Sequence, residues 1–379
     1  MAKITVLGAG LVGGVMVRDL AERHEVLSTD FSAEPLEPLA DHANVTTRTL
    51  DCTDAPAVRE AVDGADVVVC AVPGHLGFET LGTLVDAGCR VADISFVPED
   101  ALRLDARARE TGAVVVTDIG VAPGIDNLIL GYHDVRMEVR RFECLVGGLP
   151  VERSFPFQYK APFSPVDVIE EYLRPARVYE NGREVVKPAL SEPEYVDFPG
   201  LGALEAFNTD GLRSLLQTMA HIPDMVERTL RYPGHRELML AFREAGFLSD
   251  APVEVDGVSV SPRAFTSKLL FDSWKLRPGE PELTVERVTI EGVEDGESVR
   301  HVYHLDDRGD PATGTSSMAR TTGYTCTGMA DALVDGAWAT PGVCPPELVG
   351  RAEGLWERIR AHLAERRVEL THVREVINP

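Results

Sequence analysis

Three glycines near the N-terminus have the spacing of a phosphate-binding loop. Gly8, Gly10 and Gly13 directly follow the apolar run Ile4–Leu7 and precede a segment of helical character. In such a loop the first glycine permits a tight turn, the second lets the backbone approach a pyrophosphate, and the third lets the helix pack closely on the strand. Asp30 stands 22 residues after Gly8, where a carboxylate can accept hydrogen bonds from ribose hydroxyls. The pattern predicts a dinucleotide site that prefers NAD, because an acid there repels a 2′-phosphate and no arginine follows it.

Further residues would complete this cofactor site. Ligands of doubly wound sheets bind at the carboxyl ends of the strands, so each strand end is a candidate. We expect cofactor contacts from Leu11 and Val12 in the loop, Asp51 and Cys52 near the adenine, Ala71, Val72 and Pro73 near the nicotinamide ribose, and Ser95 after the fifth strand. Ordinary loop structure is the alternative for each of them.

Other side chains could transfer protons or bind a small charged substrate. Lys160 has apolar neighbours that would favour its neutral amine, and His235 follows a Tyr-Pro-Gly turn, so both are candidates for proton transfer. Arg231 and Arg320 could each grip a carboxylate in two places. An exposed lysine, a helix-capping histidine and structural ion pairs are the alternatives. Three polar residues near strand ends could bind an amine or orient water: Asp93, Asp118 and Asn127.

No metal-binding pattern is evident. The six cysteines include no Cys-x-x-Cys pair. His301 and His304 are three residues apart on a predicted strand, so their side chains face opposite ways and cannot share an ion. We therefore predict chemistry without a metal.

The elements that must position these residues are those of an α/β protein. Apolar runs alternate with segments of helical length in the first third, which predicts a doubly wound parallel sheet covered by helices. The predicted strands are Ile4–Leu7, Glu25–Ser28, Val45–Arg48, Val67–Val72, Val91–Ile94 and Val114–Thr117. The predicted helices between them are Leu11–Glu22, Ala55–Asp63, Leu76–Ala87 and Pro98–Thr111.

Beyond this first third the pattern indicates a second, mixed α/β domain. It contains short strands, helices near 166–173 and 236–245, and a hairpin whose strands run through 284–292 and 299–305. The pattern becomes helical again after Gly323. We predict a Rossmann domain over 1–125, a second domain over 126–322 and a C-terminal segment over 323–379.

Composition limits the class of protein. The 379 residues carry 37 Lys and Arg against 61 Asp and Glu, a net charge of -24, which disfavours nucleic acid and anionic membranes as partners. No apolar stretch approaches the roughly 20 residues that span a bilayer. Neither a signal peptide nor a disulfide framework is evident, so we expect a cytoplasmic protein.

Several sequence blocks resemble the saccharopine dehydrogenase-like family along essentially the whole chain. They are Val121–Asn127, Gly147–Pro150, Tyr159–Lys160, Glu171–Ala176, Glu205–Leu212, Thr229–His235, Ser317–Tyr324 and Gly342–Glu347. The resemblance implies a second domain with an open mixed sheet used for substrate binding and dimerisation, and C-terminal helices that return to the Rossmann domain. It also implies a homodimer or higher oligomer and an amino-acid substrate.

Within the family the lysine 6-dehydrogenases are the best likeness, which implies NAD-dependent oxidative deamination of the ε-amine of lysine to 2-aminoadipate 6-semialdehyde and ammonia. Ala122 resembles that type, whereas Gly124–Asn127 resembles the glutamate-forming saccharopine dehydrogenases. Glutamate-forming saccharopine oxidation and a non-catalytic NAD-binding sensor are the alternatives. Either oxidation needs an unprotonated nitrogen, a proton acceptor and a partner for the substrate carboxylate.

Overall fold

The apolar runs of the first third form a parallel sheet that is buried on both faces. The computed structural model of the protein describes residues 1–161, 165–277 and 279–378, with the backbone alone for 165–167. The strand order is β17-β6-β5-β4-β1-β2-β3, and each neighbouring pair is parallel. The strands are β1 (Lys3–Leu7), β2 (Glu25–Asp30), β3 (Val45–Thr49), β4 (Val67–Cys70), β5 (Arg90–Asp93), β6 (Val114–Val116) and β17 (Gly342–Cys344). This order confirms the predicted doubly wound sheet.

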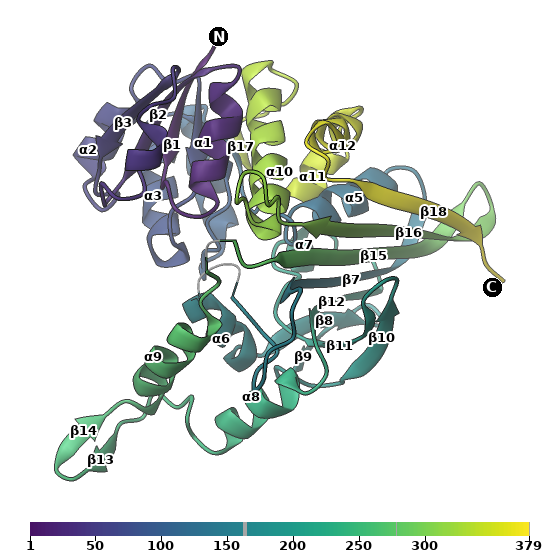
Figure 1. Ribbon diagram of the computed structural model, residues 1–379. Helices are drawn as coiled ribbons and strands as arrows, with labels where there is room; N and C mark the ends of the chain where they lie inside the picture. Colours follow the sequence, from purple (N-terminus) through teal and green to yellow (C-terminus); the bar gives the residue numbers. More distant parts are fainter. Residues whose placement is uncertain (162–164, 278, 379) are drawn as a thin grey trace.

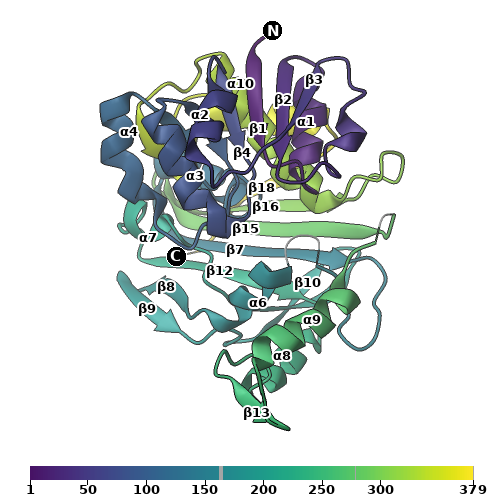
Figure 2. The same cartoon turned by 90° about the vertical axis from the view of Figure 1, so that its left-hand side faces the viewer.

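Helices cover both faces of the parallel sheet (Figure 2). They are α1 (Gly13–Ala21), α2 (Ala55–Val62), α3 (Gly74–Asp86) and α4 (Asp105–Thr111), together with the short 3-10 helices Glu37–Leu39 and Ala101–Leu104. The helix predicted over 98–111 is therefore divided. The side chain of Asp100 accepts a hydrogen bond from the backbone N–H of Leu102 and caps the 3-10 turn, so α4 begins only at Asp105.

A larger mixed sheet forms the second part of the molecule. Its order is β10-β11-β12-β7-β15-β16-β18, with β8 paired to β12 and β9 paired to β8. Its strands are β7 (Glu138–Pro150), β8 (Ala176–Glu180), β9 (Arg183–Lys187), β10 (Glu194–Phe198), β11 (Gly202–Asn208), β12 (Asp224–Arg231), β15 (Glu282–Glu294), β16 (Glu297–Arg308) and β18 (Leu370–Val376). β15 and β16 pair in antiparallel register, which confirms the predicted hairpin.

Helices fill the space between the two sheets (Figure 1). They are α5 (Ile125–Asp134), α10 (Ser317–Val334), α11 (Pro346–Gly350) and α12 (Leu355–Glu365). Buried side chains such as Met16, Ile129, Met329 and Trp356 belong to one continuous core that joins the two sheets. The last segment returns to the parallel sheet through β17, which pairs with β6.

Two details differ from the expected organisation. α10 begins at Ser317, so the predicted boundary at 322 falls inside one helix. The final strand, β18, pairs with β16 and extends the mixed sheet instead of packing on the Rossmann domain. β18 can do so because the hairpin leaves one edge of β16 free for backbone hydrogen bonds.

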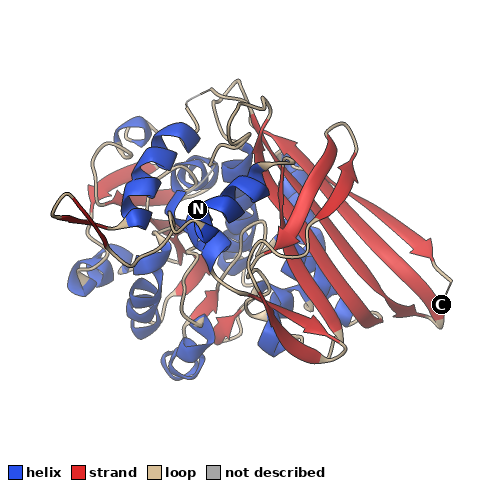
Figure 3. Cartoon of the chain, turned by 90° about the horizontal axis from the view of Figure 1, so that it is seen from below, coloured by secondary structure: helices blue, strands red, loops and turns tan. Residues whose placement is uncertain are grey.

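The remaining elements lie near the first strands of the mixed sheet (Figure 1). They are α6 (Pro165–Leu173), α7 (Leu215–Thr218), α8 (His235–Glu244), α9 (Pro262–Trp274) and the hairpin of β13 (Val253–Val255) and β14 (Val258–Val260). Seen from below, the hairpin and the wide part of the mixed sheet lie at opposite sides of the molecule (Figure 3). Within the part of the chain that is described, every helix is too short or too polar to cross a lipid bilayer.

Candidate active site

The glycine-rich loop between β1 and α1 has the shape that a phosphate group requires. A Cβ atom at Gly8 would lie 2.5 Å from the carbonyl oxygen of Ala71, and a Cβ atom at Gly13 would lie 2.0 Å from the carbonyl oxygen of Gly8. Neither position therefore accepts a side chain. A Cβ atom at Gly10 would meet no described atom within 4 Å, so the backbone there faces open space. Gly10 lies at the N-terminal end of α1, where free N–H groups favour an anion, and the loop fits a dinucleotide pyrophosphate.

Asp30 ends β2 beside this loop. Its Oδ2 accepts a hydrogen bond from the backbone N–H of Ala9 at 2.8 Å, and its Oδ1 accepts one from the N–H of Ser32 at 3.0 Å. These bonds fix the carboxylate next to the glycine loop, in the place where a ribose would lie. Phe31 follows Asp30 and exposes 78% of its surface, so the adjoining residue offers no positive charge to a 2′-phosphate.

The other predicted cofactor residues lie around the same strand ends. Leu11 is 70% exposed beside Gly10, and the Oδ1 of Asp51 accepts hydrogen bonds from Thr53. Pro73 directly precedes α3. Val12, Cys52 and Ala71 are partly buried and Val72 is buried. These positions are compatible with cofactor contacts, which stay predictions.

Asp93 and Ser95 shape the turn after β5. The Oδ1 of Asp93 accepts hydrogen bonds from the N–H of Ser95 at 3.0 Å and from its hydroxyl at 2.5 Å. Burial raises the pKa of Asp93 to about 7. Both side chains are buried from solvent, and the two hydrogen bonds join them to each other. Cofactor binding by Ser95 and amine binding by Asp93 therefore stay predictions.

Arg213 brings a largely buried cation to the carboxyl ends of the parallel strands. Its Nε donates to Asp118 Oδ2 at 3.0 Å, and its Nη2 donates to the carbonyl oxygen of Val97 at 3.0 Å. The guanidinium carbon lies 4.3 Å from the centre of the Phe96 ring. Asp118 follows β6 and Arg213 follows β11, so this contact joins the two sheets at what we call the junction. Left-handed backbone is found at both residues, with φ of 54° for Asp118 and 45° for Arg213. Such strain gathers at functional sites.

Three buried carboxyl groups lie next to the junction. We call Asp126 of α5, Glu227 of β12 and Glu286 of β15 the carboxyl cluster. One oxygen of each is buried without a hydrogen-bond partner among the described residues. Burial raises the pKa of all three, that of Asp126 to about 7, and repulsion by neighbouring carboxylates raises it further. Groups that hold a proton near neutral pH can serve as acids and bases.

Glu227 is the member of the cluster that faces the junction. It is 6% exposed, against 0% for Asp126 and 1% for Glu286. A Cβ atom at Gly211 would lie 2.1 Å from the carboxyl carbon of Glu227, so the loop that carries Arg213 packs directly on this glutamate. Within the carboxyl cluster, Glu227 is therefore the candidate for proton transfer at the junction.

Asn127 has a structural environment. Its Nδ2 donates to Glu347 Oε2 at 2.9 Å, and the hydroxyl of Thr218 donates to Glu347 Oε1 at 2.5 Å. These bonds join α5 to α11 and α7. They engage the Asn127 amide that the sequence assigns to substrate binding, and that role stays a prediction.

The structure brings Arg231 and His235 together around Tyr172. Arg231 Nε donates to the Tyr172 hydroxyl at 3.0 Å, and this hydroxyl lies 2.9 Å from His235 Nε2. His235 Nδ1 lies 2.9 Å from the carbonyl oxygen of Phe157, so it carries the proton and the Tyr172 hydroxyl donates to Nε2. Burial lowers the pKa of His235 to about 3. Both ring nitrogens are thus engaged in this arrangement, which favours the structural interpretation of His235.

Lys160 and Arg320 have partners of their own. Lys160 Nζ donates to the carbonyl oxygen of Ser273 at 3.0 Å, and residues 162–164 of its predicted apolar flank lie outside the described residues. Arg320 Nε lies 3.1 Å from Asp307 Oδ2, and its Nη2 donates to the carbonyl oxygens of residues 366 and 367. Among the described contacts, none joins either side chain to the junction. Arg320 therefore ties α10 to β16 and to the end of α12.

Sequence reasoning missed Arg213, Asp126, Glu227 and Glu286. Signals for them exist, since Arg213 directly follows the block ending at Leu212, and Asp126 lies within the block Val121–Asn127. A glutamate at an inward position of an alternating strand is the signal for Glu227 and Glu286. Only the pairing of the strands shows that these two side chains share a face.

Two family models match the chain. The model described as the saccharopine dehydrogenase NADP binding domain matches residues 4–116, and the saccharopine dehydrogenase C-terminal domain matches residues 120–368.

Curated relatives agree with these matches. The chain is 27% identical over 273 residues to a saccharopine dehydrogenase [NADP(+), L-glutamate-forming] of Schizosaccharomyces pombe, covering 67% of this chain and 60% of that one. It is 25% identical over 269 residues to the enzyme of the same name from Saccharomyces cerevisiae, covering 66% of this chain and 60% of that one. The aligned part thus spans about 60% of the length of these relatives.

Solved structures show the same fold. The apo, L-glutamate-forming saccharopine dehydrogenase of Saccharomyces cerevisiae superposes with a TM-score of 0.82 at 20% identity, covering 99% of this chain and 100% of that one. A homospermidine synthase of Legionella pneumophila in complex with NAD superposes with a TM-score of 0.66 at 11% identity, covering 98% and 91%.

Proposed function

The chain belongs to the saccharopine dehydrogenase family of oxidoreductases, and we propose that it oxidises the secondary amine of saccharopine with NAD and releases L-glutamate. The named relatives favour this reaction over the deamination of lysine that the sequence blocks put first. The observation that carries the proposal is that the buried carboxyl group of Glu227 shares one face of β12 with Arg231 and packs against the loop that carries Arg213.

The spacing of these three residues suits a substrate with an amine between charged ends. Glu227 and Arg231 are four residues apart on β12, so both side chains point to the same face about 13 Å apart. Arg213 lies at the junction, near enough for its charge to act on the Glu227 carboxyl group. Saccharopine carries a dicarboxylate arm in addition to the carboxylate of lysine, so it has more than one group for a guanidinium to bind. Lysine has one such group.

Each residue of the proposed site would have its own role in the reaction. NAD held by the glycine-rich loop and Asp30 would supply the hydride acceptor for the carbon next to the substrate nitrogen. Glu227 takes the proton of the ammonium group, which leaves the nitrogen lone pair free to drive hydride loss. Arg213 and Arg231 hold the carboxylates and so orient this carbon. Water then hydrolyses the imine, and saccharopine, NAD⁺ and water yield L-glutamate, 2-aminoadipate 6-semialdehyde, NADH and a proton.

The residues of the nucleotide site support NAD as the cofactor. The matched family model and the curated relatives carry NADP in their names. Here Asp30 holds a carboxylate at the ribose position, and Phe31 follows in place of a cation. A negative charge there repels a 2′-phosphate, so NAD should bind more tightly than NADP.

The turnover of saccharopine and of lysine should be compared with pure protein and NAD at mildly alkaline pH, by the absorbance of reduced nicotinamide. We expect reduction with saccharopine. Reduction of NAD with lysine but not with saccharopine would instead support the oxidative deamination of lysine. Binding of NAD without reduction by either substrate would favour a sensor, an alternative that the engaged side chains of Lys160 and Arg320 also fit. A sensor would not need the buried carboxyl group of Glu227.

A further inference from the structure

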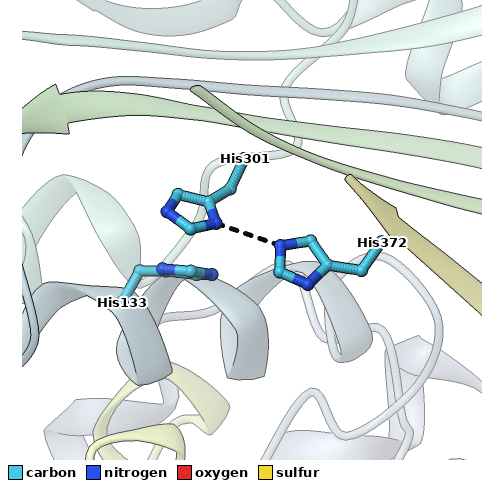
Figure 4. A group of neighbouring side chains, drawn as sticks. All are labelled: His133, His301 and His372. Atoms are coloured by element: carbon cyan, nitrogen blue, oxygen red, sulfur yellow. Dashed lines mark hydrogen bonds between the residues drawn. The ribbon is translucent and has the colours of Figure 1, made fainter. Parts of the chain in front are cut away.

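Three histidines from distant parts of the chain meet between α5 and the mixed sheet. His133 lies in the last turn of α5, His301 on β16 and His372 on β18, and their rings face a common space (Figure 4). One ligand nitrogen of each lies within 4.8 Å of those of the other two. His301 Nδ1 and His372 Nε2 are 3.0 Å apart. We propose that His133, His301 and His372 bind a transition-metal ion of the zinc class.

The hydrogen bonding of the cluster is incomplete without a further group. His133 Nε2 lies 2.9 Å from the hydroxyl of Tyr303, but His133 Nδ1 and His301 Nε2 are buried with no hydrogen-bond partner in the described part of the chain. Buried nitrogens of this kind are rare, because they lose their hydrogen bonds to water and gain none in return. An ion that accepts the lone pair of His133 Nδ1 would compensate for this loss on the His133 ring.

The geometry suits an ion that prefers imidazole. Two nitrogens at the usual zinc distance of 2.0–2.1 Å in a tetrahedral site are about 3.3 Å apart, close to the separation already present between His301 and His372. Imidazole ligands suit Zn²⁺, Ni²⁺ and Cu²⁺ better than Mg²⁺ or Ca²⁺. His372 is exposed, so water can reach a fourth position.

The surroundings also resemble the second layer of contacts in metal sites. Ligating histidines usually offer their other nitrogen to a carboxylate, a carbonyl or a hydroxyl-bearing group. The Tyr303 hydroxyl contacts His133 in this way, and Glu294 Oε1 lies 3.8 Å from His301 Nε2. Tyr303 also stacks on His372, with ring centres 4.1 Å apart.

The site would have a structural role. His133 and Asp126 are seven residues apart on α5, about 10 Å along the helix, so the ion would lie away from the carboxyl cluster. It would join the exposed edge strand β18 to β16 and α5. This inference is independent of the proposed function, because it concerns different residues and needs no substrate.

Titration of the metal-free, untagged protein with Co²⁺ tests the proposal, followed by competition with Zn²⁺. We expect one Co²⁺ per chain, with visible absorption typical of nitrogen ligands, and loss of that absorption when Zn²⁺ is added. His372→Ala should weaken binding more than about tenfold. His304→Ala is the control, because His304 lies on the same strand as His301 with its side chain on the opposite face, and this variant should bind like the wild type.

Equal affinities of the wild type and of His372→Ala, or no binding by the wild type, would overturn the proposal and leave a cluster of packed imidazoles. The far-ultraviolet circular dichroism of each variant establishes that it is folded. If His372→Ala does not fold, His372→Gln replaces it, with the same expected loss of Co²⁺ absorption.

Discussion

Asp118 and Arg213 meet at 3.0 Å although 95 residues separate them in the chain, and both have left-handed backbone. The contact joins the end of β6 to the loop after β11, so it sets the position of the mixed sheet relative to the nucleotide site. The same loop packs on Glu227 through Gly211. A single loop thus positions the cation of the junction and covers the carboxyl group that we assign to proton transfer.

Arg213→Lys should lower kcat/KM for saccharopine by about tenfold or more. A lysine keeps the charge but cannot bond Asp118 and the Val97 carbonyl together while lying flat on Phe96. Steady-state rates test this. Arg109→Lys is the control, because its partner Asp105 is within its own helix on the surface, and its rates should match the wild type. If the Arg213→Lys enzyme keeps the wild-type kcat/KM, Arg213 has no role in the site.

Glu227→Gln should lower kcat by about 100-fold or more, the usual contribution of a positioned base. The amide has the same shape but cannot take the proton of the amine. Stability to urea should be unchanged or higher, since burial already disfavours the charged form of Glu227 in the folded chain. Glu143→Gln, which changes a residue on the outer face of β7, should alter neither quantity. A Glu227→Gln variant with the wild-type rate would exclude this base.

The carboxyl cluster should make stability fall as pH rises. Asp126 has a pKa of about 7 in the folded chain against an ordinary value of 3.8. Both states are protonated below pH 4, and between about pH 4 and 7 the unfolded chain releases the proton first, so the free energy of unfolding decreases. Asp126→Asn should remove at least about 1.4 kcal/mol of that decrease, the equivalent of one pKa unit. Urea unfolding at pH 4 and pH 8 measures it; an identical decrease in both proteins would contradict the assignment.

Asp30→Ser should raise the ratio of NADP to NAD affinity by about tenfold. The change removes the charge that repels a 2′-phosphate, while serine can still hydrogen-bond to ribose. Fluorescence titration with each reduced nucleotide gives the ratio. Asp41→Ser, at an exposed position outside β2, should leave the ratio as in the wild type. A wild-type protein that already prefers NADP would refute the role of Asp30.

The sequence predicted what depends on local pattern. The glycine loop, Asp30 and the strands of the parallel sheet are each encoded within about 30 residues, because a turn, a helix start and an apolar run follow one another there. His301 and His304 do lie on one strand and face opposite ways, as their spacing predicts.

Contacts between distant segments could not be predicted in this way. Glu227 and Glu286 approach only because β12 and β15 both pair with β7. His301 meets His133 and His372 only because the last strand joins the edge of the mixed sheet. His235 appeared suited to proton transfer from its turn, but the aromatic residues that surround it come from other elements.

The molar ratio of L-glutamate released to NAD reduced, measured with pure protein and saccharopine, tests the central claim most directly. The proposed reaction predicts one L-glutamate for each NAD reduced and no ammonia. Ammonia released from lysine with reduction of NAD, and no L-glutamate from saccharopine, would contradict it.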